Sequence, residues 1–258
     1  MNKEILNSII KGEVYGIIPA RAGSKGVRDK NIRMLKGYPM IAYSIAAAAM
    51  CPEISRAIVS TDSPDYAEIA KQYGGEAPFL RPAELAGDAS PDIGFMMHAI
   101  EWLYEKEGRV PEFFAHLRPT YPLRDISIMS EAVKKMKADP SATSLRSAYL
   151  ATNTPYKWFQ EREGYFQSIL SGQTLDEANN PRQAFPDVFI PDSHIDILRT
   201  SFIVEKELMH GDRMIAYKVP LGVDIDAAKD IDYLDYYMEE HPSPVYDYLR
   251  RNYEKVVS

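Results

Sequence analysis

The sequence predicts an α/β fold in which a mostly parallel sheet carries helices on both faces. Short apolar segments alternate with segments whose apolar residues recur at helical spacing, and the first strand is apolar along nearly its whole length. A strand without a polar face is typical of a parallel sheet that is covered on both sides. At 258 residues the chain is long enough to bury a substantial core.

Strands and helices alternate along the first half of the chain. Leu6 and Ile9 indicate a short leading helix, and residues 14–19 form the apolar first strand. The elements expected after it are a helix around residues 41–48, a strand at 57–60, a helix at 64–73, a helix around 93–104, a strand at 113–117 and a helix around 129–136.

The pattern loosens between about residues 149 and 189, where aromatic, glycine and polar residues mix without a sustained period. Residues 159–166 indicate a hairpin that turns near Gly164. We therefore expect a single domain over residues 1–258 with an insertion at about 149–189. The regular elements expected after the insertion are strands at 195–199 and 214–219 and a helix around 231–238, and residues 223–226 are expected to end a late strand.

Composition excludes several classes of protein. The net charge of −7 argues against a general nucleic-acid binder, which usually has a clustered basic face. The single cysteine, Cys51, cannot form a disulfide within the chain and indicates a reducing compartment. No apolar run reaches the length of a membrane span, and residues 1–13 lack the apolar region of a signal peptide. We expect a cytoplasmic protein that binds neither nucleic acid nor membrane.

The loop after the first strand, residues 19–31, is rich in phosphate-binding groups. Its two glycines allow backbone amides to approach an anion, Ser24 adds a hydroxyl donor, and the cations are Arg21, Lys25, Arg28 and Lys30. Neither the P-loop spacing nor the dinucleotide-binding glycine pattern is present. The alternative is a solvated basic turn, in which Arg28 in particular need not touch a ligand.

Without gaps, residues 19–31 match the pattern P-A-R-x-G-S-K-G-x-x-x-K-N. This segment resembles the signature of the acylneuraminate cytidylyltransferases, which activate 2-keto sugar acids with CTP, and the resemblance extends over about residues 14–238. It implies a doubly wound, Rossmann-like sheet of the nucleotide-diphospho-sugar transferase type. The implied reaction joins CTP and a nine-carbon sugar acid, such as sialic, legionaminic or pseudaminic acid, to give a CMP-sugar and pyrophosphate.

The resemblance also implies residue roles. Arg21 and Lys30 are expected to hold phosphates as catalytic residues, and Arg81 is expected to contact the nucleotide through its planar guanidinium. The alternative for Arg81 is a surface salt bridge with Glu84. The full expected nucleotide site is Ala20, Arg21, Gly23, Ser24, Lys30, Asn31, Arg81, Asp88 and Ser90.

Asp224 and Asp226 are the expected metal ligands. Residues two apart on a strand point to the same face, so these carboxylates could converge on one Mg²⁺ ion and offset phosphate charge. The resemblance favours metal binding at both, with Asp226 also in a catalytic role. The alternative is that Asp226 only caps the helix that follows and Asp224 is solvated.

The sugar end of the site is expected to involve Arg118, Thr120, Lys157, Arg182 and Gln183. The resemblance places Lys157 and Arg182 at the sugar carboxylate, for which a cation pair is the expected solution; the alternative for each is a solvated charge. Arg118 stands where sialic-acid enzymes commonly have glutamine, and residues 192–194 replace the usual asparagine-glycine. These departures point to a relative of sialic acid. We expect His194 to be structural.

Two other functions stay open. The first is activation of a shorter, eight-carbon 2-keto sugar acid, although enzymes of that kind diverge within residues 23–26, whose pattern is intact here. The second is a nucleotide-sugar sensor that binds CTP without turnover, which should have lost Lys30 or a metal aspartate. The insertion resembles the family's dimerisation element, so a homodimer is expected.

Overall fold

The computed structural model describes residues 2–23 and 29–255. Within those ranges a six-stranded sheet has the strand order β10-β6-β9-β5-β1-β4, with β9 antiparallel to both of its neighbours and the other pairs parallel. The expected mostly parallel sheet is confirmed. The strands of this sheet are β1 (Ile9–Pro19), β4 (Arg56–Ser60), β5 (Val110–His116), β6 (Ser144–Leu150), β9 (Phe189–Arg199) and β10 (Met214–Lys218).

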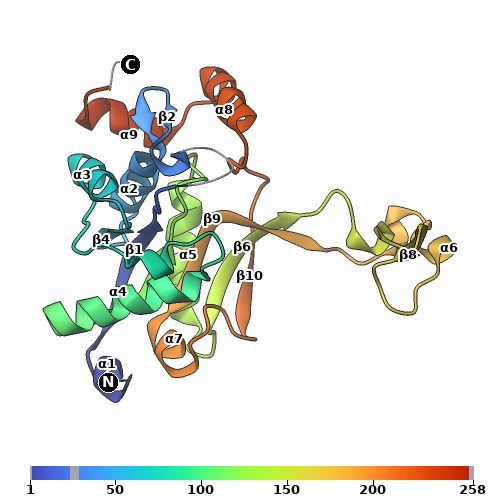
Figure 1. Ribbon diagram of the computed structural model, residues 1–258, viewed down its shortest axis with the longest axis horizontal. Helices are drawn as coiled ribbons and strands as arrows, with labels where there is room; N and C mark the ends of the chain where they lie inside the picture. Colours follow the sequence, from blue (N-terminus) through green and yellow to red (C-terminus); the bar gives the residue numbers. More distant parts are fainter. Residues whose placement is uncertain (1, 24–28, 256–258) are drawn as a thin grey trace.

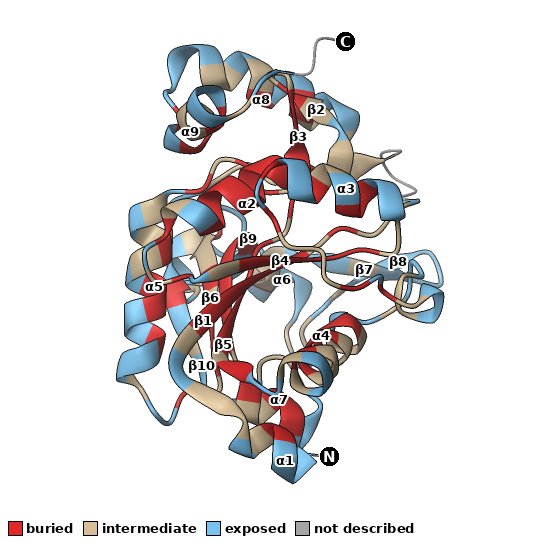
Figure 2. Ribbon diagram, turned by 90° about the vertical axis from the view of Figure 1, so that its left-hand side faces the viewer, coloured by how far each residue is buried: buried red, intermediate tan, exposed pale blue. Residues whose placement is uncertain are grey.

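Helices cover both faces of the sheet (Figures 1 and 2). One layer contains α1 (Asn2–Asn7), α4 (Asp92–Glu107) and α7 (Thr200–Lys206). The other contains α2 (Met40–Met50), α3 (Pro64–Gln72), α5 (Ile126–Ala138), α8 (Ala228–Glu240) and α9 (Pro244–Asn252). Successive side chains of β1 point to opposite faces of the sheet and pack against both helix layers. Tyr15 and Ile17 pack with the first layer, and Val14 and Ile18 pack with the second. No helix in the described part of the chain has the length and apolarity to cross a membrane.

The structure corrects the sequence-based elements in three places. The strand β6 was not predicted, because Ser144, Arg146 and Ser147 break its apolar pattern, although Ser144 and Ser147 are fully buried. The short helix α7 was also missed. The third correction concerns residues 219–226, which follow β10 as an irregular loop and contain no strand.

Three parallel strands end at one edge of the sheet. Pro19 of β1 lies opposite Ser60 of β4, and Ile17 of β1 lies opposite His116 of β5. The antiparallel strand β9 crosses this edge, with Asp196 opposite His116. In open α/β sheets, ligands bind beyond the carboxyl ends of the strands, so the loops after β1, β4 and β5 are in the expected place for a site.

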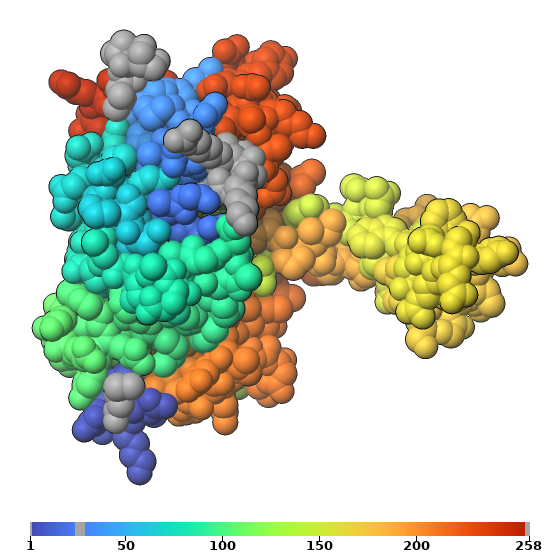
Figure 3. Space-filling model, viewed as in Figure 1, coloured from blue at the N-terminus to red at the C-terminus, as the bar shows by residue number. Residues whose placement is uncertain are grey.

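Residues 151–188 form an arm that projects from the body of the molecule (Figures 1 and 3). The ladder between β6 and β9 extends to the pair Leu150 and Phe189, and the amide of Ala151 donates to the carbonyl of Val188 at the base of the arm. The predicted hairpin is confirmed, with Gly164 at positive φ in its turn. The arm contains β7 (Phe159–Arg162), β8 (Tyr165–Ser168) and α6 (Leu175–Ala178).

The body of the molecule also contains a two-stranded sheet formed by β2 (Met34–Leu35) and β3 (Tyr38–Pro39).

Candidate functional site

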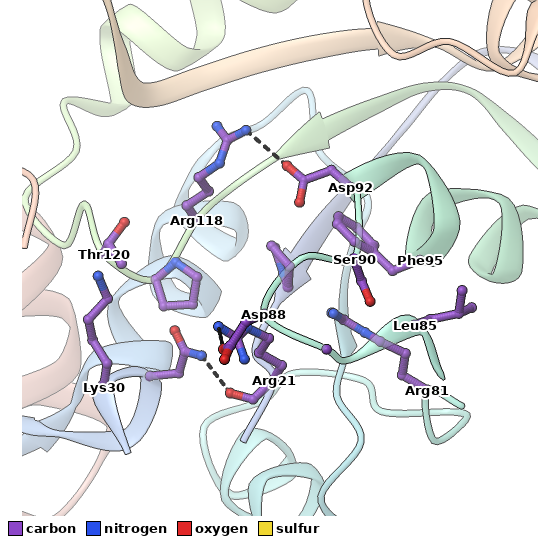
Figure 4. Close-up of a pocket in the computed structure, with 14 residues that line it drawn as sticks. Arg21, Lys30, Arg81, Leu85, Asp88, Ser90, Asp92, Phe95, Arg118 and Thr120 are labelled. Atoms are coloured by element: carbon purple, nitrogen blue, oxygen red, sulfur yellow. Dashed lines mark hydrogen bonds and ion pairs between the residues drawn. The ribbon is translucent and has the colours of Figure 1, made fainter. Parts of the chain in front are cut away.

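A pocket of about 370 Å³ lies at the edge where β1 and β5 end (Figure 4). Its walls come from the loop after β1, the segment before α4 and the loop after β5. Eight of the residues predicted from sequence line it: Arg21, Lys30, Asn31, Arg81, Asp88, Ser90, Arg118 and Thr120. The residues that sequence reasoning did not single out are Pro19, Leu85, Gly87, Asp92, Phe95 and Pro119.

The loop after β1 is held by several contacts, two of which involve Arg21. Arg21 forms an ion pair with Asp88 across the pocket, at 2.8 Å, and the Asn31 amide donates to the Arg21 carbonyl at 2.9 Å. Ala20 is fully buried behind the pocket, where its amide donates to Ser60. Gly23 has φ +72°, a conformation that favours glycine. Ser24, which was also expected to contact the nucleotide, lies outside the described residues.

Lys30 joins the pocket to the loop that contains the two aspartates. Its Nζ donates to the carbonyl of Ile225 at 2.7 Å and lies 3.8 Å from Oδ1 of Asp226. The amide of Ile225 in turn donates to the carbonyl of Thr120 at 2.8 Å. Ile225 therefore fixes the aspartate loop against both sides of the pocket.

Asp224 and Asp226 flank Ile225 in irregular backbone, so the expectation that they share one face of a strand is wrong. The Asp226 side chain is 88% exposed. Asp224 has a buried Oδ1 without a hydrogen-bond partner among the described residues. The helix-capping alternative for Asp226 does not hold either, because Oδ2 of Asp230 accepts from the amides of Asp226 and Ala227 at the start of α8.

Oxygen donors of this kind fit a magnesium ion. Mg²⁺ is commonly bound through one or two carboxylates together with substrate phosphates. A buried carboxylate oxygen that has no protein donor is costly unless something else satisfies it. Among the described residues Asp224 offers such an atom, two residues before the exposed carboxylate of Asp226.

Arg81 is buried and forms part of the pocket wall. Its Nε and NH2 donate to the hydroxyl and carbonyl oxygens of Ser60, at 3.1 and 2.7 Å, and its guanidinium lies 4.7 Å from the centre of the Phe95 ring. Burial lowers the pKa of Arg81 to about 10. These contacts differ from the surface salt bridge with Glu84 that was the alternative.

Arg118 lies at the other end of the pocket, between two carboxylates. It donates to Asp196 at 3.0 Å and to Asp92 at 3.3 Å. Burial alone would lower the pKa of Arg118, but the charges of Asp196 and Asp92 raise it above its ordinary value. Sequence reasoning did not single out Asp92, because the helix dipole favours an acidic residue at the start of any helix, and Asp92 begins α4.

The loop after β5 is fastened by Arg124, which is 2% exposed. Its donors reach oxygen atoms on α2, on the loop itself and on β9: Ser44 Oγ and the carbonyls of Arg118, Tyr121, Ser193 and His194. Burial lowers its pKa to about 10. Sequence reasoning gave Arg124 no role, because several of its acceptors, on α2 and β9, lie far from it in the chain.

His194 is buried on β9, and its expected structural role stays a prediction. Its ring nitrogens lie 3.3 Å from the Tyr121 hydroxyl and 3.3 Å from the carbonyl of Asp125. Burial lowers the pKa of His194, so the ring is neutral near neutral pH. It adjoins a second cavity of about 360 Å³ on the far side of the loop after β5.

Lys157, Arg182 and Gln183 lie in the arm, away from the pocket of the same chain (Figures 1 and 3). Lys157 donates to the carbonyl of Asn180 at 2.9 Å, which places it beside the segment that contains Arg182. Arg182 pairs with Asp187 at 3.3 Å. The arm thus brings the two expected carboxylate ligands into one region without bringing them to Arg118 and Thr120.

Comparison with known proteins identifies the family. A family model described as Cytidylyltransferase matches residues 15–142. N-acylneuraminate cytidylyltransferase of Escherichia coli O18:K1:H7 is 33% identical over 223 residues, which cover 86% of this chain and 50% of that protein, so the chain spans half the length of this relative. Pseudaminic acid cytidylyltransferase of Campylobacter jejuni is 32% identical over 66% of this chain and 75% of its own length.

A solved structure shares the fold. A solved structure of CMP:2-keto-3-deoxy-manno-octonic acid synthetase complexed with CTP superposes with a TM-score of 0.65 and 15% identity, over 88% of this chain and 99% of that one. At this identity the likeness concerns the fold alone. From the pocket at the strand edge and the identity to these relatives together, we conclude that the chain belongs to the acylneuraminate cytidylyltransferase family of nucleotidyltransferases.

Proposed function

We propose that this protein transfers CMP from CTP to the anomeric hydroxyl of a nine-carbon 2-keto sugar acid. The observation that carries the proposal is the pocket itself. It is lined by Arg21 and Lys30 from the loop after β1, by the buried Arg81, and by Arg118 and Thr120 from the loop after β5. We place the reaction in the cytoplasm, in keeping with a single, buried cysteine.

In this reaction the anomeric oxygen of the sugar acid attacks the α-phosphorus of CTP. A new P–O bond forms as the bond to the β-phosphate oxygen breaks, pyrophosphate leaves with the bonding pair, and the hydroxyl proton goes to solvent. Arg21 and Lys30 would hold the phosphates and offset the charge that moves to the leaving oxygen. Asn31 already fixes the backbone at Arg21, so it would keep that guanidinium in place.

Asp224 and Asp226 would hold a magnesium ion, and Lys30 would keep their loop beside the phosphates through Ile225. Such an ion supplies charge neutralisation to the triphosphate when it is bound. The buried oxygen of Asp224, which has no hydrogen-bond partner within residues 2–23 and 29–255, and the exposed carboxylate of Asp226 support this assignment.

We further propose a homodimer in which the arm of one protomer reaches the pocket of its partner. Large apolar side chains are exposed on the arm, with Tyr165 at 76% and Phe166 at 65% exposure, as suits an interface. The expected carboxylate ligands, Lys157 and Arg182, lie on this arm and not at their own pocket. An exchange of arms would let each pocket receive them from the partner.

A pyrophosphate-release assay tests the activity. With CTP and Mg²⁺, we expect release to depend on a nine-carbon 2-keto sugar acid from a panel that also contains an eight-carbon acid. Preference for the eight-carbon acid would favour the shorter-substrate enzyme. Binding of CTP without release in the presence of any acid would favour a sensor and refute the proposed activity.

Removal of one metal ligand tests the magnesium assignment. Asp226→Asn should leave CTP binding measurable and slow turnover by on the order of a hundredfold, because a charge-stabilising group is lost. Glu112→Gln, which alters an ion pair far from the pocket, is the control and should keep wild-type turnover. Unchanged turnover in Asp226→Asn would exclude the role.

A further inference from the structure

The two cations expected to hold phosphates belong to separate stretches of the loop after β1. Arg21 lies just after the strand, Lys30 begins a short 3-10 helix (Lys30–Ile32), and both side chains line the pocket (Figure 4). A triphosphate is a short chain of limited length, so both cations can contact it only if their spacing matches that length. Whatever holds the two stretches relative to each other therefore affects how well the pocket fits CTP.

The first stretch is held by Asp62, which follows β4. Its Oδ1 accepts a hydrogen bond at 2.8 Å from the backbone amide of Ala22, the residue after Arg21. A hydrogen bond from an amide to a carboxylate is stronger than one between neutral groups. Next to Asp62, the hydroxyl of Ser63 accepts from the amide of Tyr66 at 3.3 Å and caps α3, so the backbone at Asp62 is fixed to the start of that helix.

The second stretch is held by Tyr66, in the first turn of α3. Its ring is buried in the core, and its hydroxyl donates to Oδ1 of Asp29 at 3.0 Å. Asp29 is the residue before Lys30. Burial, together with the hydrogen bond to the Asp29 carboxylate, raises the pKa of Tyr66, so the hydroxyl stays protonated and able to donate near neutral pH.

The backbone at Asp29 has a conformation that this side-chain contact helps to maintain. Its φ of 53° and ψ of 35° are left-handed, which costs free energy for residues other than glycine. Aspartate is one of the few residues that adopt this conformation, because its short side chain can be held by a hydrogen bond. The turn at Asp29 sets the direction in which the chain enters the 3-10 helix. The Tyr66 hydroxyl therefore fixes the turn that directs Lys30 to the pocket.

Both contacts come from one rigid unit of the fold. Asp62 and Tyr66 lie at the junction of β4 and α3, where β4 pairs with β1 as far as Ser60 opposite Pro19 and α3 packs into the core. Because one unit supplies both contacts, it holds both stretches in a single frame. Their spacing is then set before a ligand binds, which reduces the ordering that binding would otherwise have to impose.

We propose that Asp62 and Tyr66 are positioning residues that hold Arg21 and Lys30 at the spacing a nucleoside triphosphate requires. Neither Asp62 nor Tyr66 belongs to the pocket lining that the described residues form, so each acts through the backbone of the loop and not by touching the ligand. This role rests on the proposed function, since Arg21 and Lys30 are taken as the phosphate ligands of the same pocket.

Tyr66→Phe tests the second contact, because it removes the hydroxyl and keeps the buried ring. In calorimetric titrations with Mg²⁺ present and no sugar acid, the Kd for CTP should rise by about tenfold, as expected for the loss of a hydrogen bond to a charged group. The Kd for CMP should rise by less than about threefold, because a single phosphate does not have to span both cations. A merely structural defect would weaken the binding of both nucleotides alike.

Matched variants separate position from stability. Tyr217 is also buried and its hydroxyl donates to the backbone carbonyl of Ile128 at 3.1 Å, so Tyr217→Phe should keep the wild-type Kd for both nucleotides. Asp62→Ala should weaken CTP binding as Tyr66→Phe does. Asp62→Asn should recover part of that loss, because the amide oxygen of asparagine can still accept from Ala22.

A variant at the acceptor tests whether Tyr66 acts through Asp29. Glycine suits the left-handed backbone and lacks the carboxylate, so Tyr66→Phe should not weaken CTP binding further when it is added to Asp29→Gly. A further tenfold loss in the double variant, of about the size expected for Tyr66→Phe alone, would overturn the inference. A wild-type Kd for CTP in Tyr66→Phe or in Asp62→Ala would also overturn it, as would equal losses for CTP and CMP.

Failure of the proposed function would look different. These titrations use only CTP and CMP, so they do not depend on turnover of any sugar acid. If the wild type binds CTP and turns over no acid, the proposed activity is refuted, whereas a selective loss of CTP binding in Tyr66→Phe still supports the positioning role. A wild type that does not bind CTP would overturn both.

Discussion

Replacement of Arg124 by lysine tests how the loop after β5 is held. Five oxygen atoms accept hydrogen bonds from this guanidinium: Ser44 Oγ and the carbonyls of Arg118, Tyr121, Ser193 and His194. Lysine offers three donors from a single point, so at least two of these acceptors lose their partner. At about 1–3 kcal/mol for each buried unpaired group, the free energy of unfolding should fall by about 2–6 kcal/mol.

Urea denaturation of wild type and Arg124→Lys measures this loss. Arg213→Lys is the matched control, because Arg213 is exposed and donates only to the Ser141 hydroxyl among the described residues; its effect should stay within about 0.5 kcal/mol. If the variant folds, the KM for the sugar acid should rise more than the KM for CTP, since Arg118 shares the loop. A loss below about 1 kcal/mol for Arg124→Lys would refute the donor-counting argument.

Three further predictions concern stability, the aspartate loop and assembly. Burial lowers the pKa of His98, His116, His194 and His210 below the ordinary value of about 6.5. As pH falls below about 6.5, the unfolded chain therefore binds protons that the folded chain does not, and the free energy of unfolding should drop by up to about 1.4 kcal/mol per pH unit for each histidine. A thermal midpoint that is flat from pH 7.5 to about 5.5 would contradict this. An alanine Cβ at Gly222 would lie 1.6 Å from the Tyr121 hydroxyl oxygen and 2.4 Å from its ring. Gly222→Ala should therefore displace the aspartate loop and lower kcat with little change in CTP binding, and a wild-type kcat in this variant would exclude the close contact as a constraint. Serine at both Tyr165 and Phe166 should shift sedimentation from dimer to monomer and reduce turnover while CTP still binds; a wild type that sediments as a monomer at micromolar concentration would refute the assembly.

Sequence reasoning located most of the pocket because its residues lie in short, ordered motifs at strand ends. The loop after β1 and the residues Arg118 and Thr120 follow buried apolar strands, and parallel strands that end at one edge bring such loops together. The phosphate-loop motif also identified the family, since its specified positions are contiguous.

Other residues could not be found in this way. The partners of Arg118 come from α4 and from an antiparallel strand, and the distance in sequence between Arg118 and Asp196 hides their contact. β6 was missed because its buried serines satisfy their hydroxyls through tertiary hydrogen bonds: Ser144 donates to the carbonyl of His210, and Ser147 donates to Asp192. The strand expected at Asp224 and Asp226 does not form, because Ile225 bonds to Thr120 and Lys30 in place of a neighbouring strand.

By itself the sequence determined the fold class, the family and the part that the loop after β1 takes in the pocket, because apolar periodicity and a contiguous motif are local properties of the chain. Only the tertiary structure decided which charges compensate one another and where the arm lies. Burial and strand register set those relations, as when β9 places Asp196 behind Arg118 and the ladder of β6 and β9 carries Lys157 and Arg182 away from their own pocket.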